Sequence, residues 1–142
     1  MAGAFGTHLK ERHRMNFTRW AALLLLSICA QVTFAGEIKP YSQAEFNKLA
    51  AEGKPILLDF RTDWCGTCAA QAPVIRDLMA QSKYRDLTTL TIDYDTDTAL
   101  VQSYRVSMQS TLILLAGKQE LGRSVGVTSR EGIERLLSTV VR

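Results

Sequence analysis

Two cysteines separated by two residues are the side chains in this sequence best suited to chemistry. Cys65 and Cys68 lie within "TDWCGTCAAQAPV", at the start of a stretch that has the pattern of a helix. Such a CxxC pair can hold a metal ion, attach a haem covalently, or form a disulfide that exchanges electrons. These three chemistries need different neighbouring residues, so the rest of the sequence discriminates among them.

The neighbours needed for a metal or a haem are missing within residues 36–142. A structural zinc site needs four ligands, and this range has no histidine and no third cysteine, because His8, His13 and Cys29 all precede it. A c-type haem needs a histidine directly after the second cysteine, where this sequence has Ala69. We therefore predict no metal site within one chain, and no cofactor besides a redox-active disulfide.

A disulfide between Cys65 and Cys68 could be structural or reactive. Its loop encloses only two residues, so it would remove little entropy from the unfolded chain and would stabilise the fold weakly. Cys65 lies where the predicted helix begins, and free N–H groups at that end favour a thiolate. Cys68 lies one turn further along and is placed to resolve a mixed disulfide. The spacing predicts thiol–disulfide exchange, with Cys65 as nucleophile.

The N-terminal region has the pattern of a secretory signal peptide. Basic residues from Lys10 to Arg19 precede an apolar run over residues 20–30, and small residues follow at Thr33 and Ala35. This predicts a signal peptide over residues 1–35 and one domain over residues 36–142, in the periplasm or otherwise exported. An uncleaved membrane anchor is the alternative.

The predicted domain is electrically neutral. Residues 36–142 contain 13 lysines and arginines and 13 aspartates and glutamates, so the positive charge of the chain belongs to its N-terminal segment. This balance gives no support to nucleic-acid binding. We expect a monomer that acts on protein thiols and disulfides.

Short apolar runs alternate with helical patterns, which predicts an α/β domain with a central mixed sheet of four to five strands and helices on both faces. Capping boxes at Ser42 with Glu45 and at Thr128 with Glu131 mark two helix starts. Four helices are predicted: Ser42 to Glu52, a helix after the CxxC, Ala99 to Tyr104, and a C-terminal helix. The helix after the CxxC has the apolar positions Ala69, Ala72, Ile75, Leu78 and Met79, and the C-terminal helix has Ile133, Leu136, Leu137 and Val140 on one face. The predicted strands are Pro55 to Phe60, Leu87 to Asp95, Thr111 to Ala116 and Glu120 to Val127.

Several of these features agree in spacing with one family. "ILLDF" ahead of "WCGTC", a proline eight residues after the first cysteine, and "TLILLAGKQELGRSVG" before a terminal helix resemble thioredoxin across Ile38 to Val141. The resemblance implies the thioredoxin fold and the activity of a protein-disulfide oxidoreductase. It also implies that Pro73 lies within the active-site helix, where we expect a kink.

The aspartate within "ILLDF" is the third predicted catalytic residue. Asp59 lies in an apolar strand, and burial there would raise its pKa. The resemblance to thioredoxin implies that Asp59 accepts the proton of Cys68 through water. In thioredoxin a lysine on the neighbouring strand accompanies this aspartate, and Thr89 takes that position here. We therefore expect burial, more than a cation, to set the pKa of Asp59.

Three residues around the cysteines are predicted to contact clients. Trp64 is expected to shield the thiols and to offer an apolar contact. Gly66 and Thr67 form the dipeptide between the cysteines, where thioredoxin has glycine and proline. Unlike proline, Thr67 keeps its backbone N–H, which adds a donor near Cys65.

Ser110 departs from the family pattern. Thioredoxin has a cis-proline at this position, opposite the CxxC, and a cis bond before a non-proline residue costs about 2.5–4 kcal/mol. We therefore expect a trans Gln109–Ser110 peptide and a reshaped loop. Three hypotheses follow: the Ser110 hydroxyl hydrogen-bonds Cys65, Met108 and Gln109 pair with an extended client and define client choice, and the missing proline opens the thiols to metal, so that a dimer assembles four cysteines around zinc or an iron–sulfur cluster.

The direction of electron flow depends on a reduction potential that the sequence does not fix. "KPILLDFRTDWCGTC" is also similar to the periplasmic thioredoxin-like domain of membrane thiol-electron transporters, which favours a reductant supplied by a membrane partner. Such a protein would serve electron transport and cell redox homeostasis. The alternatives are a metal-binding or iron–sulfur dimer, and a client-binding module without catalysis.

Overall fold

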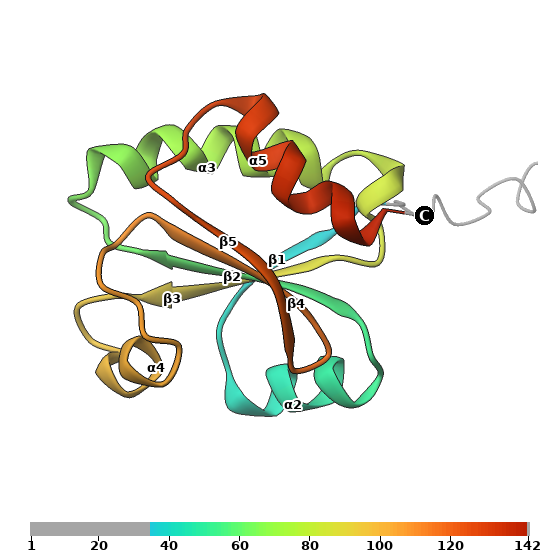
Figure 1. Cartoon of the computed structure of the whole chain (residues 1–142), viewed down its shortest axis with the longest axis horizontal. Coiled ribbons are helices and arrows are strands. Elements are labelled where there is room, and N and C mark those ends of the chain that lie inside the picture. The colour runs from blue at the N-terminus through green and yellow to red at the C-terminus, as the bar shows by residue number, and fades with distance from the viewer. Residues whose placement is uncertain (1–34, 142) are drawn as a thin grey trace, which may run out of the picture. The chain divides into compact units, whose positions relative to one another are not determined.

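The computed structural model describes residues 35–141, which build one five-stranded sheet with helices on both faces (Figure 1). The strands are β1 (Glu37–Pro40), β2 (Pro55–Arg61), β3 (Thr88–Asp93), β4 (Thr111–Ala116) and β5 (Gln119–Val125). Their order across the sheet is β1-β3-β2-β4-β5. β3 is parallel to β1 and β2, whereas β4 is antiparallel to β2 and β5. The predicted mixed sheet is confirmed.

The helices cover the sheet in two layers, with α3 and α5 on one face and α2 and α4 on the other (Figure 1). Their bounds are α2 (Gln43–Ala51), α3 (Gly66–Met79), α4 (Thr98–Ser103) and α5 (Arg130–Leu137), with short 3₁₀ helices η1 (Ser82–Tyr84) and η2 (Ser138–Val140). The helices predicted from the sequence are therefore present.

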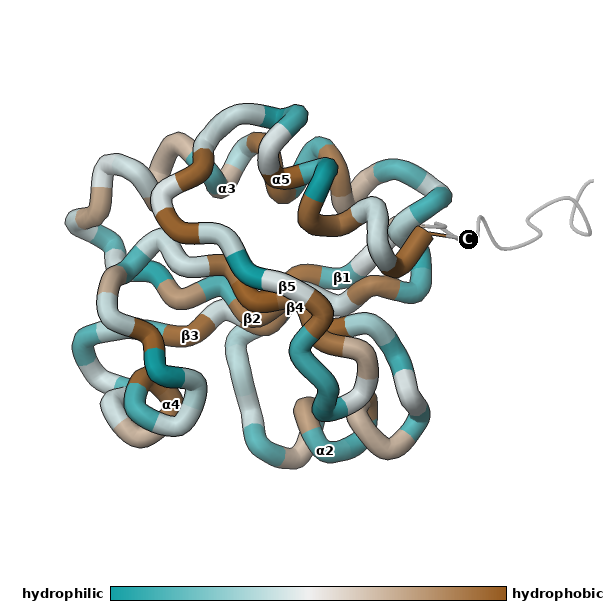
Figure 2. Tube along the Cα trace, in the orientation of Figure 1, coloured by the Kyte–Doolittle hydropathy of each residue, from teal (hydrophilic) through white to brown (hydrophobic). Residues whose placement is uncertain are grey.

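β2 lies at the centre of the sheet and is buried over Ile56 to Phe60. It pairs with β3 on one side and β4 on the other, so both of its edges are hydrogen-bonded. Leu57 faces α3 and α5, whereas Ile56, Leu58 and Phe60 belong to the core on the side of α2 and α4. Figure 2 shows the apolar, brown segments concentrated along the central strands. The prediction that β2 is central and buried is confirmed.

Two details of the predicted elements are corrected. β1 was not predicted as a strand, because it is a four-residue edge strand that is mostly exposed and contains two charged residues; it is defined by parallel pairing with β3. The C-terminal helix is capped by Ser129 and not by Thr128. The Ser129 hydroxyl accepts a hydrogen bond from Gly132 N at 3.2 Å, so α5 begins one residue later than predicted.

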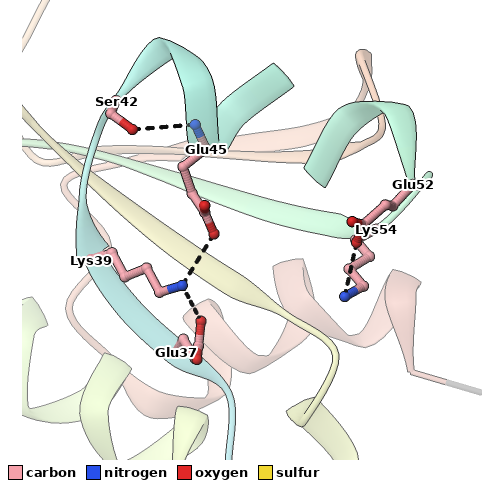
Figure 3. Close-up of polar contacts among 6 residues, drawn as sticks. All are labelled: Glu37, Lys39, Ser42, Glu45, Glu52 and Lys54. Carbon is pink, nitrogen blue, oxygen red and sulfur yellow. Dashed lines mark hydrogen bonds and ion pairs between the residues drawn. The ribbon is translucent and has the colours of Figure 1, made fainter. Parts of the chain in front are cut away.

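α2 begins at the predicted cap, but its capping box is only half formed. Ser42 Oγ accepts a hydrogen bond from Glu45 N at 3.2 Å. The Glu45 carboxylate instead accepts from Lys39 Nζ of β1 at 3.1 Å, and Lys39 also pairs with Glu37 (Figure 3). These ion pairs are largely solvent-exposed and link β1 to α2 at the surface. A further exposed pair joins Lys54 to Glu52 (Figure 3).

Apart from Ala35, the predicted signal peptide lies outside the described residues, as do Cys29 and both histidines. It stays a prediction. Within residues 35–141, no helix combines the length and the apolar character needed to cross a membrane.

Candidate active site

The two cysteines form a disulfide at the first turn of α3. Cys65 is the N-cap of the helix, and its Sγ accepts a hydrogen bond from Cys68 N at 3.1 Å. The two Cα atoms are 5.2 Å apart. Cys65 is 6% exposed and Cys68 is 2% exposed, so the outer sulfur is the one nearer to solvent.

The end of β2 places Cys65. After β2 ends at Arg61, the backbone turns so that Cys65 N donates to Thr62 O at 3.4 Å. Ala69 N then donates to Cys65 O at 3.0 Å, which begins the helical hydrogen-bonding pattern. The helix start is therefore fixed directly after the carboxyl end of the central strand, where α/β sheets commonly place their sites.

Asp59 is buried on the face of the sheet that α3 and α5 cover. It is 4% exposed and shares this face with Leu57, since residues two apart on a strand point to the same side. Burial raises the pKa of Asp59 to about 6, and the positive charge of Arg61 opposes that rise. The prediction that burial sets the pKa of this carboxyl is confirmed.

Thr89 lies on the same face, where the family pattern has a lysine. It pairs with Leu57, while Asp59 pairs with Thr91, two residues further along β3. Thr89 is fully buried, and its hydroxyl has no hydrogen-bond partner among the described residues. No cation from β3 therefore faces Asp59, which is why burial dominates its pKa.

Trp64 does not bury its ring. It is 68% exposed, and its indole Nε1 donates to the Asp95 carboxylate at 2.8 Å. This bond ties the residue before Cys65 to the loop that follows β3. Gly66 is exposed and Thr67 half-buried, so both lie at the accessible end of α3. The tryptophan is therefore an exposed apolar surface next to the disulfide.

Ser110 adopts a left-handed backbone conformation in place of a cis bond. The described residues contain no cis peptide bond, so the expected trans Gln109–Ser110 peptide is confirmed. The φ of Ser110 is +61°, and its hydroxyl donates to its neighbour's carbonyl, Gln109 O. In this disulfide-bonded state the hydroxyl proton is thus directed at Gln109 O and not at Cys65.

The sequence pattern missed one buried polar residue of α3. The predicted apolar face included Ala69, which is exposed, whereas Gln71 is 1% exposed. Gln71 Nε2 donates to Ser110 O at 3.2 Å and to Val127 O at 2.9 Å. A helical face drawn from Cys68 through Gln71 to Ile75 would have found it, because these residues are three and four apart.

Within residues 35–141, no three histidine, cysteine, aspartate or glutamate side chains lie close enough together to hold a metal ion. This finding concerns one chain. The zinc or iron–sulfur site of the predicted alternative would take two cysteines from each of two chains.

Comparisons with known proteins agree with the fold and the cysteine pair. The thioredoxin family model matches residues 37–139. Thioredoxin from Mycobacterium bovis is 36% identical over 91 residues, which are 64% of this chain and 78% of that protein. A bifunctional thioredoxin reductase/thioredoxin from Mycobacterium leprae is 33% identical over 96 residues, 68% of this chain but only 21% of that longer protein.

A solved structure extends the agreement to three dimensions. Trxlp from Edwardsiella tarda EIB202 superposes with a TM-score of 0.68 at 40% sequence identity, over 74% of this chain and 99% of that one. The fold and the CxxC at a helix start define a thiol–disulfide oxidoreductase. The chain belongs to the thioredoxin family.

Proposed function

We propose that this protein is an exported reductant that passes two electrons from a membrane thiol-electron transporter to disulfides in client proteins. The observation that carries the proposal is the placement of Cys65, whose sulfur caps α3 and accepts the backbone N–H of Cys68. In the reduced protein the same N–H and the helix N-terminus favour a Cys65 thiolate. A thiolate is the species that attacks a disulfide.

Two steps of exchange follow. The Cys65 thiolate attacks one sulfur of the client disulfide, and the other client sulfur leaves as a thiolate with the bonding electron pair. The Cys68 thiolate then attacks Cys65 Sγ, which releases the second client thiolate and leaves the Cys65–Cys68 disulfide. The client gains two electrons and the protein loses two. The membrane partner restores them by the same chemistry in reverse.

Asp59 supports the second step, in which the buried Cys68 must lose its proton. A base works best when its pKa lies near the operating pH. The pKa of Asp59, about 6, leaves this carboxyl largely ionised at neutral pH and available as an acceptor. Because Cys68 is only 2% exposed, bulk water has little access to its thiol, and a buried carboxylate on the same side of the sheet supplies the base.

The client surface is proposed to surround the disulfide. Trp64 and Met108 are among the exposed large apolar residues, at 68% and 51% exposure. Trp64 directly precedes Cys65, and Met108 lies two residues before Ser110 in the turn that Gln71 joins to α3, so we expect both side chains beside the reacting sulfurs. An extended client would pair with the backbone near Gln109 while its apolar side chains contact these two residues.

Export and the membrane partner rest on the N-terminal pattern and on the sequence similarity around "KPILLDFRTDWCGTC". An oxidising compartment requires an electron supply for any dithiol reductant. Acid trapping of thiols in cells, followed by alkylation, tests the direction of electron flow. We expect most of the protein to be reduced, and to become oxidised when the membrane partner is removed. A protein that is mostly oxidised with its partner present is an oxidant instead.

Replacing Cys68 by serine tests the chemistry itself. Without a resolving thiol, mixed disulfides between Cys65 and client proteins accumulate. We expect them to be trapped as covalent complexes that dithiothreitol releases. The control is the Cys65→Ser, Cys68→Ser double variant, which should trap nothing. Unchanged client binding without trapping would instead indicate a binding module. Absorbance spectra and metal analysis of protein purified without chelator test the metal-binding dimer, and a colourless, metal-free monomer would exclude it.

A further inference from the structure

Gln71 joins three segments that are distant in the sequence. It lies on the buried side of α3, three residues after Cys68, and donates to Ser110 O and to Val127 O at 3.2 and 2.9 Å. Burying an amide group is costly unless it is hydrogen-bonded, and the Oε1 of Gln71 has no hydrogen-bond partner among the described residues, so a glutamine that is 1% exposed is expected to have a specific role. Here both acceptors are backbone carbonyls of turns that flank the strand pair β4 and β5.

The turn that Gln71 reaches contains the left-handed Ser110. A non-glycine residue in this conformation is disfavoured and persists when its surroundings fix it. Ser110 N donates to Phe60 O at 2.8 Å, and Ser110 O accepts from Gly126 N at 3.0 Å. The amide of Gln71 adds a second donor to the same carbonyl. It is the one side chain among the described residues that donates to the Ser110 backbone.

The same amide couples this turn to the active-site helix. Ser110 is anchored to the end of β2 through Phe60, and Cys65 is anchored to the same strand end through Thr62. Gln71 adds a second link between the Ser110 turn and the disulfide, because it lies in α3, the helix that Cys65 caps, and donates to Ser110 O. The turn and the disulfide are thereby held in a fixed relation, with Met108 and Gln109 exposed or half-buried beside them.

We infer that Gln71 is a positioning residue for client binding: its side-chain amide holds the Ser110 turn in the conformation that receives a client polypeptide opposite the disulfide. This inference rests on the proposed function, in which clients dock beside Gln109. The hydrogen bonds of Gln71 go to Ser110 O and Val127 O and not to either sulfur. Gln71 should therefore influence how well a protein client binds, but not the intrinsic reactivity of the thiols.

The test separates these two quantities. Gln71→Leu has similar size and removes both hydrogen bonds. With dithiothreitol as electron source, we expect the KM for insulin to rise roughly 5- to 10-fold, in line with the loss of one effective hydrogen bond. The kcat for insulin and the rate with bis(2-hydroxyethyl) disulfide should stay within about twofold, because the small disulfide needs only the thiols. The matched control is Gln102→Leu on the exposed side of α4, which should leave all three unchanged.

A second pair of variants keeps the inference testable if Gln71→Leu does not fold. Gln71→Asn keeps an amide but is one methylene shorter, so it should also raise the KM. Adding Ser110→Gly should lower that KM again, because glycine adopts positive φ without the cost that serine bears. An unchanged KM in the folded variants, or an equal loss of rate with insulin and with the small disulfide, overturns the role of Gln71. Failure of the wild-type protein to reduce insulin would instead count against the proposed function.

Discussion

Helices α2 and α3 both begin with a side chain that accepts a hydrogen bond from the backbone three residues later. Ser42 Oγ accepts from Glu45 N at 3.2 Å, and Cys65 Sγ accepts from Cys68 N at 3.1 Å. In both helices the cap satisfies an N–H that has no partner within the helix. The oxygen of Ser42 can only stabilise the start of α2 by this hydrogen bond. The sulfur of Cys65 occupies the same place and can also ionise and form a covalent bond.

The surroundings of the two helices differ as much as their caps. α2 buries only Phe46 and Leu49, and its Glu45 pairs with Lys39 at the surface. α3 buries Cys68 and Gln71 among apolar residues, above a face of the sheet that contains Asp59. The comparison teaches that a shared capping geometry becomes a reactive site when buried polar groups surround it, because burial shifts their pKa and fixes their partners.

The largest effect is expected when the cap of α3 is made like that of α2. Cys65→Ser retains a capping side chain but loses the nucleophile, so insulin reduction should fall to the background rate. Measured against the reduced wild-type protein, the free energy of unfolding should change by less than about 1 kcal/mol, since serine is a good N-cap. Cys65→Ala should be equally inactive and less stable than Cys65→Ser. Equal stability of these two variants would contradict a capping role for the sulfur.

The second effect concerns Asp59, the buried carboxyl on the face of the sheet beneath α3. Within residues 35–141, the face beneath α2 has no such residue. Asp59→Asn removes the proposed base and should lower turnover at pH 7 on the order of 100-fold. The same substitution should raise the stability of the fold at neutral and higher pH. The folded pKa of about 6 exceeds the unfolded value near 3.9, so the wild-type protein loses stability as the pH rises between these values.

Because asparagine does not ionise, Asp59→Asn in the disulfide form should be more stable than wild type at pH 8, by about 3 kcal/mol. That advantage should largely vanish by about pH 3, below both pKa values, where the wild-type carboxyl is mostly neutral in the folded and the unfolded state. Urea unfolding at the two pH values measures it. A stability difference that is independent of pH would show that the carboxyl is not the source.

The third effect isolates the cap of α2. Ser42→Ala removes the hydrogen bond to Glu45 N and should lower the free energy of unfolding by about 1 kcal/mol, as measured by urea unfolding. Insulin reduction should be unchanged, because α2 lies across the sheet from α3. Ser42→Asp, another good N-cap, should restore the stability. A change in reduction rate would contradict the separation of the two helices.

The smallest effect is expected at the ion pairs that join β1 to α2. Lys39→Met removes the cation shared by Glu37 and Glu45 but keeps the length of the side chain. Exposed ion pairs are screened by solvent and salt, so the Tm should fall less than in Ser42→Ala. Adding 0.5 M NaCl to the wild-type protein should remove most of that difference. A loss larger than that of Ser42→Ala would mean that β1 depends on this pair.

Much of the fold was predictable because its signals are local. The runs over Pro55 to Phe60 and Thr111 to Ala116 are apolar on both faces, and such strands are buried in a sheet covered on both sides. The edge strand β1 was missed for the opposite reason. Only pairing with β3 defines it, and its residues are mostly exposed.

By itself the sequence determined the CxxC at a helix start and the buried aspartate, since both follow from short-range spacing and from the apolar run around Asp59. Tertiary structure alone decided the left-handed Ser110, the contact of Trp64 with Asp95, and the hydrogen bonds of Gln71 to residues 39 and 56 positions away. Propensity and periodicity describe neighbours within a few residues, whereas these features depend on which distant backbone groups the packed sheet brings together.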